Sequence, residues 1–128
     1  MMRDPLDMQV VRYLANCQWP DGVSPTVAGS VPESMPDRLV TVDQTGGSRS
    51  RAGVGCLLSV WCWAGSRADA ARLAQQTALL LESMPDTLTA CATVDVQAVA
   101  RLPYPGPPWR ERYTLTIMTT WAPDDDAR

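Results

Sequence analysis

The chain has 128 residues, of which 20% are charged, and a formal net charge of −3. It contains no His and no Lys, so all eleven cationic side chains are Arg. This composition describes one ordinary globular domain, and it excludes His-based nucleophile systems, imidazole metal ligands, Schiff-base lysines and the phosphate lysine of a Walker motif.

The first predicted element is a helix that begins after Asp4 and Pro5. Asp4 suits the N-cap and Pro5 the first helical position. The apolar stripe at helical spacing comprises Leu6, Val10, Tyr13, Leu14 and Cys17. Because the first nine residues carry charges rather than an apolar run, we expect no secretory signal and synthesis in the cytosol.

Two strand segments and a hairpin tip follow the turn residues 19–22. Residues 23–31 predict a weak strand that is either an edge strand or an extended arm, because Pro25 and Gly29 interrupt it. Residues 38–45 alternate as a half-buried strand does. Gly46-Gly47 and Gly53 then frame a flexible basic tip, Ser48-Arg49-Ser50-Arg51, between antiparallel strands.

Residues 54–64 are apolar at both even and odd positions, which predicts a central strand covered on both faces. The run is much shorter than the ~20 residues that cross a bilayer, so no membrane contact is expected. Ser66 is the expected N-cap of a helix over residues 67–84, with Asp69 in the capping-box position. Pro85 is expected to close this helix.

Two further strands are predicted at residues 91–101 and 112–122, joined by a Pro-rich loop over residues 102–110. In the first of these, Val94, Val96 and Ala98 should share one half-buried face. The element order α-β-β-β-α-β-β predicts an α+β fold, a mostly antiparallel sheet packed by two helices. Residues 1–123 form the single domain, and residues 124–128 an acidic tail.

The four cysteines are Cys17, Cys56, Cys62 and Cys91. Cys56 and Cys62 face the same side of one strand but lie about 20 Å apart along it, too far for a disulfide. We therefore expect free cysteines that act as small core residues rather than redox or zinc ligands.

Two loops are candidate protein contacts. The basic tip with Arg49 and Arg51 has three alternative interpretations: a nest that binds phosphate, a solvated hairpin tip, or an arm that contacts another protein. The Pro-rich loop with Tyr104, Trp109 and Arg110 is either a rigid binding loop or a connector folded over the sheet edge. For the acidic run Asp124–Asp126, a solvated tail is favoured over a cation site. No catalytic, metal or cofactor residue is predicted.

A pattern of strands and turns over most of the chain carries a family resemblance. It includes V-P at Val31, P-D-R-L-V-T-V at Pro36, the two glycines, V-W-C-W-A, S-R-A-D-A-A-R-L-A at Ser66, and R-Y-T-L-T-I at Arg112. In this pattern the chain resembles the tail-terminator (tail-completion) proteins of siphophages, particularly those that infect actinobacteria.

The resemblance implies a structural virion protein without enzymatic activity or cofactor. It implies a homohexameric ring that caps the tail tube, stops its polymerisation and provides the head-docking surface. The implied partners are other copies of the chain, the tail tube protein and a head-completion or connector protein, with DNA passing through the lumen without specific binding. The implied location is the head-proximal end of the virion tail, after assembly in the host cytoplasm. The alternatives are a head-closure adaptor, or a small ligand-binding or enzymatic domain that uses Asp95, Glu111 or a thiol.

Overall fold

The computed structural model describes residues 4–20, 22, 24–106 and 110–123. Its centre is a five-stranded sheet with strand order β1-β2-β3-β5-β4. The strands are β1 (Thr26–Ala28), β2 (Leu39–Ser50), β3 (Gly53–Ala64), β4 (Cys91–Arg101) and β5 (Glu111–Trp121). β1 runs parallel to β2, and the other three pairings are antiparallel. The predicted α+β class and the element order are confirmed, and of the two alternatives for residues 23–31 the structure has the edge strand, β1.

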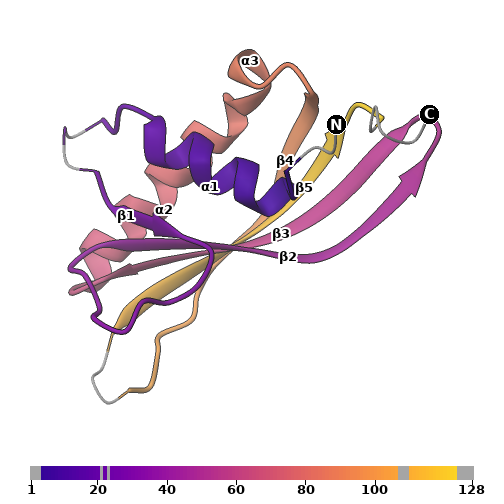
Figure 1. Ribbon diagram of the computed structural model, residues 1–128. Helices are drawn as coiled ribbons and strands as arrows, with labels where there is room; N and C mark the ends of the chain where they lie inside the picture. Colours follow the sequence, from indigo (N-terminus) through magenta and orange to yellow (C-terminus); the bar gives the residue numbers. More distant parts are fainter. Residues whose placement is uncertain (1–3, 21, 23, 107–109, 124–128) are drawn as a thin grey trace.

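The helices α1 (Leu6–Asn16), α2 (Arg67–Glu82) and the short α3 (Met84–Thr87) lie on one face of the twisted sheet (Figure 1). The apolar stripes of α1 and α2 meet the even-numbered side chains of β3 in a single core. Fully buried members of that core are Val10, Leu14, Val40, Cys56, Leu58, Val60, Leu73, Leu81, Leu115 and Ile117.

The prediction that β3 is central is confirmed, but the prediction that it is covered on both faces is wrong. The helices cover only the side that carries its even-numbered residues. On the opposite side, which we call the open face, Leu57, Ser59 and Trp61 remain partly exposed. Trp63 is buried there by local contacts. An apolar strand face is therefore left without a covering layer of secondary structure.

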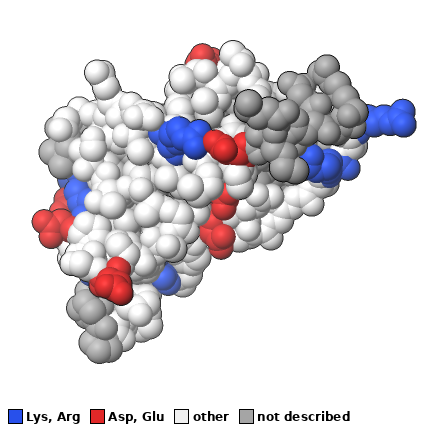
Figure 2. Space-filling model, viewed as in Figure 1, with Lys and Arg blue, Asp and Glu red and all other residues white. Residues whose placement is uncertain are grey.

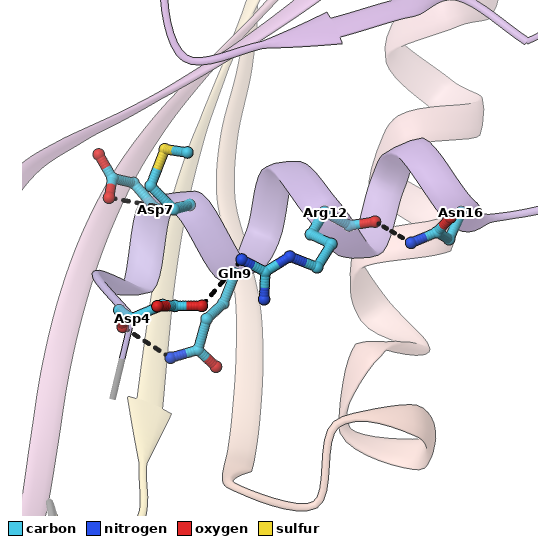
Figure 3. Close-up of polar contacts among 6 residues, drawn as sticks. Asp4, Asp7, Gln9, Arg12 and Asn16 are labelled. Atoms are coloured by element: carbon cyan, nitrogen blue, oxygen red, sulfur yellow. Dashed lines mark hydrogen bonds and ion pairs between the residues drawn. The ribbon is translucent and has the colours of Figure 1, made fainter. Parts of the chain in front are cut away.

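The ends of the helices differ in how well the sequence predicted them. Ser66 caps α2 as expected, because its Oγ accepts a hydrogen bond of 3.2 Å from the backbone N–H of Asp69. For α1 the prediction is wrong: Pro5 occupies the N-cap position and no side chain caps it. The Asp4 carboxylate instead accepts a 2.8 Å hydrogen bond from Arg12 along the solvent-facing side of the helix (Figure 3). Pro85 does not close α2, since α2 ends at Glu82 and Pro85 is the second residue of α3.

The β2–β3 hairpin is longer than predicted. Gly46 and Gly47 lie inside β2, next to an irregularity in pairing after Gln44, and the turn is at Arg51 and Ala52. The glycine at position 47 suits this place because a Cβ there would lie 2.8 Å from the carbonyl oxygen of Gly55. Gly47 therefore permits close backbone approach within the sheet, and neither glycine forms the tip.

A second irregularity, between Val96 and Ala98, changes the faces of β4. Val96 pairs with Ile117 on the helix-covered face, whereas Ala98 pairs with Thr116 on the open face. The prediction that Ala98 shares the half-buried face is wrong, because a bulge shifts the two-residue alternation by one position. Val99 takes the place on the helix side but is 51% exposed.

Candidate functional site

The open face carries a cluster of three aromatic rings around one arginine. Trp61 and Trp63 are two residues apart on β3 and so point to the same side, and Arg112 on β5 is directly opposite Trp63. The guanidinium carbon of Arg112 lies 4.4 Å from the ring centroid of Trp61, 4.8 Å from that of Trp63 and 5.6 Å from that of Tyr104. The rings of Trp63 and Tyr104 also contact each other, with centroids 5.6 Å apart. These contacts attach the start of the β4–β5 loop to the open face.

Arg112 is a half-buried cation that has no carboxylate partner among the described residues. Its Nε donates a hydrogen bond of 2.9 Å to the carbonyl oxygen of Leu102. Neither Nη atom donates a hydrogen bond to a residue that the structure describes. Burial lowers the pKa of Arg112, because desolvation disfavours the charged form. The aromatic faces offset part of that cost through cation–π attraction.

A shallow hollow of about 360 Å³ adjoins this cluster. Segments far apart in the sequence meet there: the loop after β1 and the strands β2, β3 and β5. The lining residues are Gly29, Ser30, Val31, Thr41, Asp43, Trp61, Trp63 and Arg112. Asp43 is exposed and forms no ion pair with Arg112, so the hollow presents one cation and one anion that are separate from each other.

The predicted contact residues lie at two opposite ends of the sheet. Arg49 belongs to β2 and Arg51 to the hairpin turn, next to the end where Val54 pairs with Trp121. Tyr104 contacts Trp63 near the other end of β3, roughly 35 Å away by strand length. Trp109 lies outside the described residues, as does the acidic run Asp124–Asp126.

The structure brings Tyr104 and Arg110 together in an isolated antiparallel bridge that extends the β4–β5 hairpin. One Nη of Arg110 donates hydrogen bonds of 2.9 Å to the carbonyl oxygens of Pro36 and Asp37, so this side chain fastens the loop before β2. Tyr104 remains 38% exposed. Of the pair, Tyr104 is thus the residue that is available to a partner.

The carboxylates considered for an enzyme are not close together. Glu111 is buried and accepts two hydrogen bonds from Arg101, of 3.1 and 2.9 Å. Asp95 is exposed on β4 opposite Met118, roughly 24 Å from Glu111 along β5. Within the part of the chain that the structure describes, no three His, Cys, Asp or Glu side chains are grouped closely enough to bind a metal ion.

The four cysteines are free, as predicted, and three of them are buried. Burial raises the pKa of Cys62 to about 12 and that of Cys91 to about 11, because a thiolate is poorly solvated in the core. Burial also raises the pKa of Cys17 and Cys56. Since the thiolate is the nucleophile and the metal ligand, the thiols are held in their unreactive form.

We expect slow labelling of the native protein by a thiol reagent at pH 8. A thiol with a pKa of 11 is ionised in only about one molecule in a thousand at that pH, so Cys62 and Cys91 should react more than about 100-fold more slowly than in the unfolded chain. Cys17, which is partly exposed, should react first. Mass spectrometry of the labelled peptides measures each site, and rapid labelling of Cys62 in the folded protein would contradict this burial.

Charges of both signs are interspersed on the face that carries α1, and no broad basic patch covers it (Figure 2). Among the described residues, no helix is long and apolar enough to cross a membrane. Comparison of the chain with models of known protein families and with curated proteins finds no match.

Sequence reasoning missed Arg112 as a site residue and interpreted the two tryptophans only as core. The W-x-W spacing does place both rings on one face of a strand. The position of Arg112 between them depends on the β3–β5 register, which joins residues about fifty positions apart. No local pattern around Arg112 carries that information.

Proposed function

We propose that this protein is a phage tail terminator, a structural subunit that forms a ring on the finished tail tube. The single structural observation that supports the proposal most is the placement of the candidate contact residues. The arginines of the hairpin and the exposed Tyr104 lie at opposite ends of one sheet. A subunit of this shape can contact the tail tube at one end and a head-completion protein at the other. The family resemblance of the sequence supplies the assignment, and this geometry is compatible with it.

The strand edges also favour contacts between neighbouring copies. β1 pairs with β2 only as far as Thr41, so the outer edge of β2 from Val42 onward has no partner strand among the described residues. The outer edge of β4 is likewise without a partner strand in that part of the chain. Unpaired edges of this kind are suited to association. Contacts between two different surfaces of identical subunits generate a closed ring when the rotation between subunits allows it.

The proposed mechanism requires no chemistry. A ring bound to the last tube subunits occupies the surface that the next tube ring would use, so binding free energy alone stops polymerisation. The long hairpin and α2 share one core and form a rigid frame, and rigid frames reduce the entropy that is lost when loops dock. The same ring would present its free side to the head.

A reconstruction of the virion tests the assignment directly. We expect a ring of six copies at the head-proximal end of the tail, in contact with the tube protein. A ring located inside the head connector would favour the head-closure alternative. A single copy on the tail axis would contradict both the tail-terminator and the head-closure assignments. The isolated protein can remain monomeric until a tube end templates the ring, so the virion is the sample to measure.

A further inference from the structure

The hollow beside Arg112 has the features of a binding site for a carboxylate. The Arg112 guanidinium is fixed in position by its Nε hydrogen bond to Leu102 and by stacking against Trp61 and Trp63. Arg112 lines the hollow, and its Nη groups form no hydrogen bond with a described residue. A preorganised, half-desolvated guanidinium pairs strongly with a planar carboxylate, because two parallel N–H···O bonds form without loss of side-chain entropy. The ligand class is therefore an acidic peptide segment.

The chain itself contains such a segment, Asp124–Asp126. This segment follows β5, and it cannot reach Arg112 of the same chain. The backbone N–H of Ala122 donates a 2.7 Å hydrogen bond to Ala90, so Ala122 continues the line of β5 at the end opposite Arg112. Arg112 and Ala122 are roughly 33 Å apart along the strand, whereas the chain from Ala122 to Asp126 spans at most about 14 Å. Only another copy can bring its acidic segment to this site.

We infer that the hollow lined by Trp61, Trp63 and Arg112 binds the Asp124–Asp126 segment of a second copy of this chain. The contact is head-to-tail, since it joins the end of β5 in one subunit to the opposite end of the sheet in the next. Such a contact uses two different surfaces and so suits a ring. This inference deepens the self-association in the proposed function and rests on that part of it.

The probe is the heptapeptide A-P-D-D-D-A-R, residues 122–128. It is titrated into full-length ¹⁵N-labelled protein that carries Asn at positions 124, 125 and 126. This triple variant is used because its own tail cannot compete with the peptide. We expect the indole N–H signals of Trp61 and Trp63 to shift. The signals of Trp19 and Trp121, which are buried on the helix-covered side, should not. The control peptide A-P-N-N-N-A-R should cause no shift, and salt should weaken binding.

Two variants and one control locate the site. Arg112→Gln should weaken peptide binding at least tenfold. Arg72→Gln should leave it unchanged, because Arg72 is exposed on α2 and pairs with Asp69. Asp43→Asn should strengthen binding about two- to fivefold, since it removes a like charge across the hollow. A gain of affinity cannot result from a damaged fold, so Asp43→Asn keeps the test valid even where Arg112→Gln disturbs the cluster.

Several results would overturn the inference: no shift at millimolar peptide, equal binding of the Asn peptide, or shifts confined to the helix-covered side. Where the wild-type protein self-associates, equal self-association of the triple Asn variant would mean that the site serves another acidic protein, which also overturns the inference. The test does not depend on the virion. Peptide binding without a tail ring would remove only the tail-terminator assignment, and a tail ring without peptide binding would remove only this contact.

Discussion

Replacement of Trp121 by Ala should lower the free energy of unfolding by about 3–5 kcal/mol. The Trp121 side chain is only 2% exposed and belongs to the single core. Its indole Nε1 donates a 2.7 Å hydrogen bond to the Thr119 hydroxyl, which in turn donates to the carbonyl oxygen of Cys56. The substitution leaves both a large cavity and a buried hydroxyl with one partner fewer. Domains of this size have only about 5–15 kcal/mol of stability in total, so much of the protein should unfold near physiological temperature.

Denaturant unfolding followed by circular dichroism measures this effect. The matched control is Leu79→Ala, which removes an apolar side chain that is 63% exposed on α2. Because Ala is the best helix former and little buried surface is lost, this control should change the unfolding free energy by less than about 0.5 kcal/mol. If Trp121→Ala and Leu79→Ala destabilised the protein equally, the described packing at the end of β5 would be incorrect.

The proposed role as a tail terminator predicts that a phage that lacks the protein makes tails of uncontrolled length and full heads without tails. In that proposal nothing occupies the terminal tube surface when the ring is missing, so tube subunits would continue to add. The docking surface for the head would be lost at the same time. Electron microscopy of lysates measures tail-length distributions and the fraction of joined particles.

Supply of the wild-type protein from a plasmid should restore one tail length and head joining, and Leu79→Ala should restore them equally well. Normal-length tails that are already joined to heads in the absence of the protein would show that it is not the tail terminator. Normal-length tails that are not joined to heads would favour the head-closure alternative. The phenotype therefore separates the two assembly roles.

Features that depend on a few neighbouring residues were predictable. Ser66 caps α2 because an N-cap needs only a side-chain oxygen three residues before a backbone N–H. The α1 stripe of Leu6, Val10 and Leu14 is buried because helical periodicity alone places these residues on one side. Arg49 and Tyr104 were proposed as contacts from loop composition, and that proposal stays a prediction, but their separation to opposite ends of the sheet was not predicted.

The predictions that failed depended on strand pairing. Residues 96–98 alternate perfectly in the sequence, yet a bulge places Ala98 on the open face. Gly46 and Gly47 resemble turn residues, yet both lie within β2, and Gly47 is there approached closely by the carbonyl oxygen of Gly55 in β3. A bulge and a close approach are properties of two strands together, and neither strand specifies them by its own pattern.

By itself, the sequence determined the types of the main elements, the buried apolar stripes of the helices, and the absence of His and Lys chemistry. These follow from composition, periodicity and capping, which act over a few residues. Only the tertiary structure decided that the helices leave one face of β3 open, and that Arg112 lies between Trp61, Trp63 and Tyr104. The reason is that register and layer order arise from pairing and packing between distant segments, whose free energy no local pattern contains.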